Sequence, residues 1–333
     1  AVCNKGLQGA VRRELSERHG VESALLDGRV CFPWDGAPEG PPLHGASKVV
    51  PLFGLGFEEE LRLLRGSPNL YDALSQFVEE AATRRIRSVL TPEQLAVETE
   101  GSRPLRFVAR CRVNRIGAER VAFGKDVEWT RLKAAVRDGV ERTTSWDLER
   151  RSQEVEVTVI AFFGEDHFVL GVESPEAPIG QGGVLFPWNQ VPRPGMETQL
   201  AGAMAVLAGE ALGPTGGVVL DPTCGMGTLL LAFARLRATH SEGVPRLLGM
   251  DMDTSQLERC RANFEACGLD SSDITLGDAL EPGSFSQIPD GGADALLCDL
   301  PCGAQYKASA TSEGYAGLLA LAARLLRPGG RCV

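Results

Sequence analysis

Alternating helix and strand signals over residues 199–333 constrain this chain more than any other feature. Short apolar runs typical of buried strands, such as Leu247–Met250, are separated by stretches with helical spacing, such as Ser255–Cys267. This alternation is typical of parallel α/β sheets, in which a helix connects successive strands. We predict a doubly wound, mainly parallel sheet with strands at 218–220, 247–250, 274–276 and 295–298, and helices at 200–212, 229–237, 255–267 and 313–326.

The predicted sheet is expected to be incomplete at its C-terminal side. The last helix is expected to stop at Pro328-Gly329-Gly330, and the chain ends at Arg331-Cys332-Val333, where a fifth strand is expected to begin. We therefore expect a truncated chain that lacks the strands beyond this point.

Acidic residues follow the predicted strands at their carboxyl ends. They are Asp221, Asp251, Asp278 and Asp299. Doubly wound sheets bind ligands beyond these ends, at the point where the strand order reverses. Gly225 and Gly227, in the loop after the first strand, allow the backbone to pass close to a ligand, because a side chain there would collide with it. The set predicts a site for a nucleotide-type cofactor.

Two classes of cofactor compete for this loop. A dinucleotide fingerprint requires a third glycine where Leu230 stands, and the carboxylate of Asp221 would repel a pyrophosphate. A cofactor with a sulfonium and an amino group would be attracted instead. Asp251 is suited to a ribose diol and Asp278 to the amine of an adenine ring. The sequence therefore favours a methyltransferase over a nicotinamide oxidoreductase.

The stretch Asp299-Leu300-Pro301-Cys302 indicates the kind of group that is methylated. An amine conjugated to a base ring is a poor nucleophile, because its lone pair is delocalised into the ring. Asp299 and a backbone carbonyl of the Leu300-Pro301 turn can accept the N–H groups of this amine. These acceptors would promote the reaction by positioning the amine and by electrostatic stabilisation. The stretch predicts transfer to an exocyclic amine.

Positive charge is concentrated in one segment of an acidic chain. The formal net charge is −10, but residues 103–151 carry 13 basic and 7 acidic side chains, a net charge of +6. Strict alternation over Leu105–Val113 predicts a strand with arginines on its exposed face, and a helix is expected over Val127–Arg142. A solvated face without a partner is the alternative to RNA binding, for which the candidate residues are Arg106, Arg110, Arg112, Arg131, Lys133 and Arg137.

The remaining segments complete the organisation of the chain. Residues 1–90 combine a helix at Leu7–Arg18, short strands and a second helix from Ser67, the expected N-cap, and are typical of a small α+β domain. Ser174–Thr198 has five prolines and four glycines and is predicted to be a linker. Nine cysteines form no C-x-x-C pair, and no uncharged apolar run reaches the ~20 residues of a membrane span, so we expect no metal site, no membrane and an intracellular location, in cytoplasm or nucleus.

At these motifs the chain resembles a known family. DPTCGMGT and DLPCG resemble the cofactor loop and the catalytic Asp/Asn-x-Pro-Phe/Tyr motif of S-adenosylmethionine-dependent amino methyltransferases. NKGLQGAVRREL, RFVARCRV, EVEVTVIAFFGEDHFVLGVE and METQLAGAMAVLAGEA are similar to further stretches of the THUMP-domain-containing RNA guanosine-N2 methyltransferases. The resemblance covers most of the chain.

The resemblance implies a domain order and an activity. It implies a ferredoxin-like domain at 1–90, an RNA-binding THUMP domain at 91–174, a linker at 175–198 and a Rossmann-like methyltransferase domain at 199–333. The implied reaction is methylation of guanosine N2 in tRNA or small nuclear RNA, with a small zinc-ribbon activator subunit as partner. A non-catalytic RNA-binding or scaffold protein with a decayed methyltransferase domain is the alternative.

The resemblance also assigns roles to residues. Asp299, Pro301 and Cys302 would contact the target guanine. The family has an aromatic residue at the position of Cys302, and its ring stacks on the base. Such stacking contributes about 1–3 kcal/mol to the binding free energy. The residues expected to bind S-adenosylmethionine are Asp221, Pro222, Cys224, Gly225, Gly227, Thr228, Asp251, Met252, Asp278 and Ala279.

Overall fold

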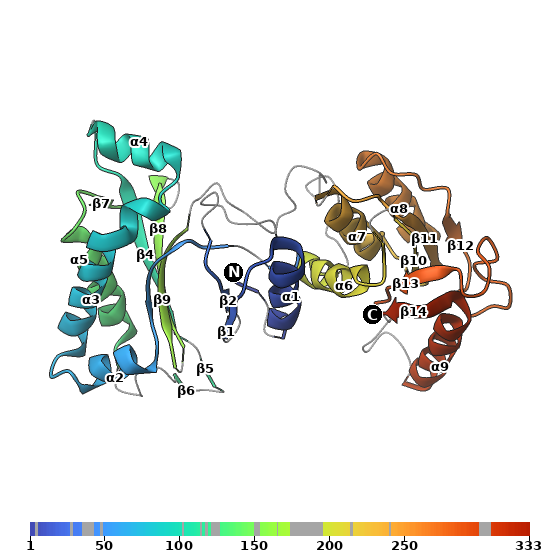
Figure 1. The fold of residues 1–333 in the computed structure, drawn as a ribbon, viewed down its shortest axis with the longest axis horizontal. Helices are drawn as coiled ribbons and strands as arrows, with labels where there is room; N and C mark the ends of the chain where they lie inside the picture. Colours follow the sequence, from blue (N-terminus) through green and yellow to red (C-terminus); the bar gives the residue numbers. More distant parts are fainter. Residues whose placement is uncertain are drawn as a thin grey trace. The chain divides into compact units, whose positions relative to one another are not determined.

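The computed structural model describes residues 1–3, 6–26, 29–34, 43–46, 49–101, 103–113, 115–116, 119–120, 127–149, 154–164, 166–173, 196–213, 216–239, 241–299 and 308–333. Contacts divide the chain into two compact units, both drawn in Figure 1. Unit 1 comprises Ala1–Pro33, Pro42–Lys48 and Pro178–Val333, and unit 2 comprises Trp34–Pro41 and Val49–Ala177. The division into ferredoxin-like, THUMP, linker and methyltransferase segments stays a prediction, and most of the expected linker lies outside the described residues.

Unit 1 is built on a five-stranded sheet with the order β12-β11-β10-β13-β14. Every pairing in it is parallel. β10 lies between β11 and β13, so the strand order reverses beside β10. The strands are β10 (Val218–Asp221), β11 (Arg246–Asp251), β12 (Ile274–Leu276), β13 (Ala293–Leu296) and β14 (Leu326–Cys332).

Helices cover both faces of this sheet. The helices are α6 (Thr198–Gly209), α7 (Thr228–Thr239), α8 (Thr254–Ala266) and α9 (Ala308–Leu325). Side chains of α6, α7 and α8 share a core with Val219 of β10, whereas α9 shares another core with Leu220. Successive strand residues point to opposite faces, so two neighbours in β10 serve two separate cores. The predicted Rossmann-like, doubly wound fold is confirmed.

The fifth strand corrects the prediction for the C-terminal side of the sheet. β14 begins at Leu326, directly after α9, so Pro328-Gly329-Gly330 lies inside a strand rather than in a terminating turn. The pairing shifts between Ala293–Leu326 and Ala295–Arg331, so the intervening residues form an irregular bulge. Because β14 pairs only with β13 in the described sheet, the N–H that proline lacks has no required partner.

The N-terminal segment belongs to unit 1 and packs on α6. α1 (Gln8–His19) contacts α6 and is followed by the antiparallel pair β1 (Ala24–Leu26) and β2 (Arg29–Cys31). The fully buried carboxylate of Glu14 accepts the backbone N–H of His44 at 3.0 and 2.9 Å. A Cβ on Gly202 of α6 would lie 2.1 Å from the His44 carbonyl oxygen, so only glycine permits this approach.

Unit 2 is a mixed sheet with the order β3-β9-β8-β4-β7. α3 and α5 pack against each other and share one core with the inner face of this sheet, which includes Phe107 and Val159. Its elements are β3 (Leu52–Gly56), α2 (Glu58–Gly66), α3 (Leu70–Arg85), the 3-10 helix η1 (Ile86–Val89), α4 (Pro92–Glu100), β4 (Arg106–Val113), β5 (Arg115–Ile116), β6 (Glu119–Arg120), α5 (Trp129–Glu141), β7 (Asp147–Leu148), β8 (Val157–Phe163) and β9 (Phe168–Glu173).

Two predictions for unit 2 have opposite outcomes. β4 alternates as predicted, with Phe107 and Ala109 buried and Arg110 exposed. The expected N-cap Ser67 is wrong: it caps the C-terminus of α2, and Asn69 starts α3 by accepting the N–H groups of the two residues after Leu70. Among the described helices, none has the length and apolarity needed to cross a membrane.

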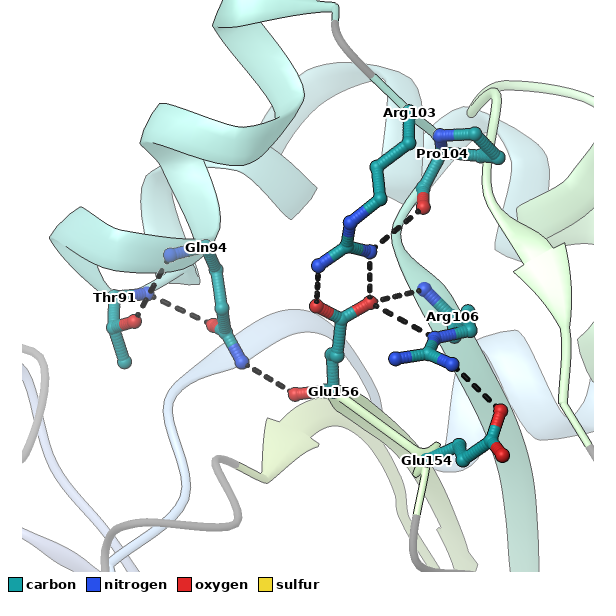
Figure 2. Close-up of polar contacts among 7 residues, drawn as sticks. All are labelled: Thr91, Gln94, Arg103, Pro104, Arg106, Glu154 and Glu156. Carbon is teal, nitrogen blue, oxygen red and sulfur yellow. Dashed lines mark hydrogen bonds and ion pairs between the residues drawn. The ribbon is translucent and has the colours of Figure 1, made fainter. Parts of the chain in front are cut away.

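A network of polar contacts fastens β4, β8 and α4 together (Figure 2). Glu156 precedes β8 and accepts two bonds from the Arg103 guanidinium, at 2.7 and 2.5 Å. Its carboxylate also accepts the backbone N–H of Arg106 at 3.0 Å, and its carbonyl accepts the Gln94 amide at 2.8 Å. Arg106 itself reaches Glu154 at 2.7 Å. One carboxylate therefore joins the starts of two neighbouring parallel strands.

We expect Glu156→Gln to lower the free energy of unfolding of unit 2 by about 1–3 kcal/mol at neutral pH, because it removes charge-assisted bonds. The hydrogen-bonded Arg103 lowers the pKa of Glu156 from 4.5 to about 2. The contribution of Glu156 is thus complete above the unfolded pKa and is lost as the pH falls through about 2.

Urea titration from pH 7 to pH 2 measures this difference. Glu80→Gln is the matched control, because Glu80 lies 4.0 Å from Arg84 and both side chains are mostly exposed. It should change the stability by less than about 0.5 kcal/mol. Equal effects of the two substitutions would show that the Glu156 network contributes nothing special.

Candidate cofactor and substrate site

The four predicted acids lie at the carboxyl ends of four neighbouring parallel strands. Asp221 ends β10 and Asp251 ends β11. Asp278 follows β12 by one residue after Gly277, and Asp299 follows β13. Since the strand order is β12-β11-β10-β13, the sheet brings these residues to one edge. The place of strand reversal lies between the ends of β10 and β13, where the loops of Asp221 and Asp299 begin.

The loop between β10 and α7 is held by backbone bonds. The N–H of Cys224 donates to the Met250 carbonyl of β11 at 2.9 Å, and the N–H of Gly227 donates to Cys224 at 2.7 Å. The side chain of Asn263 in α8 donates to the Met226 carbonyl at 2.9 Å. Thr228, another predicted cofactor residue, is the first residue of α7 and is buried. The loop is therefore braced from both neighbouring elements.

The two glycines of this loop are required for different reasons. Both have positive φ, +49° at Gly225 and +81° at Gly227, a region that side chains disfavour. A Cβ on Gly227 would lie 2.7 Å from the Cys260 sulfur, so this glycine is needed for packing on α8. A Cβ on Gly225 would meet no atom of the described residues within 4 Å. Only Gly225 therefore borders open space in which a ligand can lie.

Asp251 is placed by the loop and retains acceptor capacity. One carboxylate oxygen accepts the N–H of Gly225 at 2.8 Å and the other accepts the N–H of Asp253 at 2.9 Å. Each carboxylate oxygen can accept two hydrogen bonds, so each keeps one position for a ligand hydroxyl. The neighbouring side chain of Met252 is 72% exposed and provides an apolar surface beside them.

Asp278 is arranged in a similar way beyond β12. One of its carboxylate oxygens accepts the N–H of Leu280 at 2.9 Å. The Gly277 N–H donates to the Asp251 carbonyl at 3.1 Å, which ties this loop to the end of β11. Ala279 is buried, and its carbonyl accepts the Ser284 hydroxyl at 2.7 Å. Asp278 and Asp251 are thus held on adjacent, connected loops.

Asp221 differs from the other acids because it is almost fully buried. Only 1% of the residue is exposed, and one carboxylate oxygen accepts the N–H of Thr223 at 3.1 Å. Burial raises the pKa of Asp221 from 3.8 to about 8, with further increases from the charges of Asp251 and Asp299. A buried acid next to other acids favours a cationic ligand, whose charge would stabilise the ionised form.

Thr223 is a site residue that the sequence interpretation missed. Its hydroxyl lies 3.2 Å from the Cys298 sulfur and 3.2 Å from the carbonyl oxygen of Asp299. Asp299 is exposed, as a group that meets a large substrate must be. A hydroxyl residue inside the DPTCG stretch was the available signal. Pro301 and Cys302, predicted to meet the target base, lie outside the described residues.

The predicted RNA-binding residues of unit 2 fall into two groups. Arg106 is occupied by Glu154 and Glu156, and Arg137 contacts Asp138 at 2.6 Å. Arg131 lies 4.0 Å above the ring of Tyr71. The other three are exposed and form no ion pair with any described residue; they are Arg110, Arg112 and Lys133.

A cavity lies beside Lys133, the member of the second group on α5. It measures about 400 Å³ and is lined by Lys133 and Arg137 of α5, Val108 of β4 and Leu148 of β7. Lys133 and Arg137 are one helical turn apart, so both charges border the same cavity. One exposed cation, Lys133, and a concave surface therefore occur together in unit 2.

The parallel doubly wound sheet with a glycine loop and acids at its strand ends defines the class of Rossmann-like methyltransferases. Residues 192–333 match the family described as UPF0020, RMKL-like, methyltransferase domain. The match spans β10–β14 and α6–α9, so this part of the chain is a Rossmann-like methyltransferase domain.

Individual proteins agree with this assignment. The chain is 25% identical over 280 residues to the U6 snRNA (guanine-N(2))-methyltransferase THUMPD2 of Mus musculus, which covers 84% of this chain and 46% of that protein. It spans less than half the length of the two THUMPD2 relatives that it matches. The sequence-based resemblance to THUMP-domain RNA guanosine-N2 methyltransferases is thus confirmed.

Solved structures share the fold. TrmN from Thermus thermophilus superposes with a TM-score of 0.63 at 23% identity, covering 100% of this chain and 86% of that one. SMU.472, solved in complex with SAH, superposes with a TM-score of 0.59 at 16% identity, covering 98% and 86%. These similarities concern the fold.

We expect the ligand-free protein to lose stability as the pH rises from 4 to 8, because folded Asp221 keeps a proton that the unfolded chain releases. Asp221→Asn has no such proton to lose. Its free energy of unfolding should exceed that of the wild type by an amount that grows over this interval to roughly 3–5 kcal/mol.

Denaturant titrations at several pH values measure this gain. Asp290→Asn is the control, since Asp290 is 72% exposed and pairs with Arg324 at 3.2 Å. Its difference from the wild type should stay within about 0.5 kcal/mol at every pH. A constant difference for Asp221→Asn as well would contradict the raised pKa.

Proposed function

We propose that this chain transfers a methyl group from S-adenosylmethionine to the exocyclic N2 amine of a guanosine in structured RNA. The observation that carries the proposal is the edge of the parallel sheet, where Asp221, Asp251, Asp278 and Asp299 lie at the ends of neighbouring strands and the Gly225 loop borders open space. The confirmed resemblance to RNA guanosine-N2 methyltransferases supports the same reaction.

The residues at this edge fit the chemical groups of S-adenosylmethionine. Asp251 has one acceptor position left on each oxygen, which matches the two ribose hydroxyls. Asp278 accepts the adenine amine beside Met252 and Ala279, while Pro222, Cys224, Gly227 and Thr228 shape the loop. The buried carboxyl of Asp221 lies where a cation would lower its raised pKa. The bound cofactor supplies an electrophilic methyl group.

Asp299 binds the methyl acceptor of the reaction, the exocyclic amine of guanine. Its exposed carboxylate accepts an N–H of the guanine amine, and this bond strengthens as the nitrogen loses conjugation with the ring and becomes positive. From the sequence, a backbone carbonyl of Leu300-Pro301 and the side chain of Cys302 are also assigned to the base; these residues lie outside the described part of the chain. The chain thus contributes orientation and electrostatic stabilisation rather than a covalent intermediate.

Unit 2 holds the RNA in this proposal. Arg110, Arg112 and Lys133 contact phosphates, because their charges are exposed and form no ion pair with the described residues. Arg106, Arg131 and Arg137 act mainly within the protein, through the contacts that they already make. This role belongs to the THUMP domain predicted at 91–174, after the ferredoxin-like domain at 1–90.

The substrate is tRNA or a small nuclear RNA. The resemblance favours tRNA, and the name of the mouse relative favours U6 small nuclear RNA. A small zinc-ribbon activator subunit is the proposed protein partner, and the proposed location is intracellular, in cytoplasm or nucleus.

The reaction is tested with labelled S-adenosylmethionine and two probes, a U6 small nuclear RNA transcript and a pool of unmodified tRNA transcripts. Both are assayed with and without the activator subunit, and the nucleosides are identified by mass spectrometry. Methyl transfer to guanosine N2 supports the proposal. RNA and cofactor binding without any transfer would favour the decayed, non-catalytic alternative, and failure to bind S-adenosylmethionine would exclude the enzyme.

We expect Asp299→Ala to lower the methylation rate by about 100-fold or more, because an acceptor for the developing charge is lost. Calorimetry should show cofactor affinity within about twofold of the wild type, since the cofactor contacts lie on the other loops. Asp290→Ala, on the surface of the same unit, serves as control. Unchanged turnover would remove Asp299 from the mechanism.

We expect Arg110→Glu combined with Arg112→Glu to weaken RNA binding and to flatten its salt dependence. Each lost phosphate contact reduces the slope of log K against log salt by about 0.7–0.9. The control is Arg62→Glu with Arg84→Glu, two exposed arginines on α2 and α3. Filter binding from 50 to 200 mM salt gives the slopes, and an unchanged slope for the β4 variant would place the RNA surface elsewhere.

A further inference from the structure

Thr223 joins the two loops between which methyl transfer is proposed to occur. Its backbone N–H donates to the Asp221 carboxylate at 3.1 Å, at the start of the cofactor loop. Its hydroxyl lies 3.2 Å from the carbonyl oxygen of Asp299, on the loop after β13. One residue thus contacts the buried acid of one loop and the backbone of the other, which lies 76 positions further along the chain.

The direction of these bonds follows from the available protons. A threonine hydroxyl has a single proton to donate, and a carbonyl oxygen can only accept. Burial raises the pKa of the Cys298 thiol to about 12, so the sulfur keeps its proton at neutral pH and can donate to the Thr223 oxygen. The Thr223 proton is then directed to Asp299. Both partners of the half-buried hydroxyl are satisfied in this arrangement.

The Thr223 hydroxyl lies just beyond the last backbone hydrogen bond that connects β10 with the chain after β13. β10 and β13 are in parallel register at Val219–Ala295 and Leu220–Leu296, and the Leu297 N–H still donates to the Leu220 carbonyl at 2.8 Å. Beyond this bond the two loops leave their strands. In the part of the chain that the structure describes, the bond from Thr223 to Asp299 continues the connection between them.

We propose that Thr223 is a positioning residue for methyl transfer, which fixes the backbone of Asp299 relative to the cofactor loop. The inference rests on the proposed function, since it concerns the distance between the cofactor and the target amine. Holding the Asp299 carbonyl orients the residue whose carboxylate accepts the amine. Because both loops must be aligned to a fraction of an ångström, losing this bond affects the transfer step rather than either binding step.

The test is Thr223→Val, which keeps the shape of the side chain and removes its hydrogen bonds. Single-turnover methylation with saturating S-adenosylmethionine, on whichever of the U6 and tRNA transcripts the wild-type chain modifies, should slow by about 10- to 100-fold. The dissociation constants for S-adenosylmethionine and for the transcript should stay within about twofold. Thr223→Ser retains the hydroxyl and should restore most of the rate.

Thr239→Val is the matched control. The hydroxyl of Thr239 also donates to a backbone carbonyl, that of Arg235 at 2.8 Å, but at the end of α7 and away from the strand ends. It should leave the rate unchanged. If Thr239→Val slows transfer equally, or if Thr223→Ser is as slow as Thr223→Val, the effect is a general loss of packing and the positioning role is wrong.

The outcomes separate this inference from the proposed function. A wild-type chain that binds S-adenosylmethionine but methylates neither transcript contradicts the proposed function, and with it a positioning role in transfer. An active wild type with an unchanged rate in Thr223→Val overturns the role of Thr223 alone. A rate loss that follows from weaker cofactor binding, seen by calorimetry, would instead make Thr223 part of the cofactor site.

Discussion

The parallel hydrogen bonding of β10 to β11 on one side and to β13 on the other is the constraint on which the candidate site depends. Parallel strands end at a common edge of the sheet. Residues that follow three different strands are therefore brought together although they are far apart in the sequence. The bonds continue past the strands, at Cys224 with Met250 and at Leu297 with Leu220. Each loop therefore leaves the sheet in a set direction.

Most of the fold could be predicted because burial imposes a period on the sequence. The strand at Leu247–Met250 is apolar because both faces of the sheet are covered, and β4 alternates because only one of its faces is packed on the helices. Ends of elements were less predictable. Ser67 and Asn69 are both good caps, and only the position of α2 decides between them. The bulge that accommodates Pro328 likewise depends on β13.

Some residues of the candidate site could likewise be predicted from the sequence, whereas others could not. Acids at strand ends follow from local sequence, so Asp221, Asp251, Asp278 and Asp299 could be identified in advance. Thr223 could not, because the role proposed for it depends on a contact between the loops that follow β10 and β13. Arg106 is a candidate for RNA contact by its charge alone, and in the folded chain it also pairs with Glu154 and Glu156. Charge patterns in a sequence show where cations gather, but not which of them already have partners in the folded chain.

The close packing of Gly202 against His44 has a consequence for the order in which the protein folds during synthesis. The core of unit 2 lies within the continuous stretch Val49–Ala177, so it can close as soon as that stretch has left the ribosome. Unit 1 cannot, since α1 and the loop of His44 pack on α6, which is made much later. Buried apolar residues of α1, such as Val11 and Leu15, must wait for that surface. Because α1 is synthesised before α6, it stays without its packing partner for that interval and is exposed to chaperones.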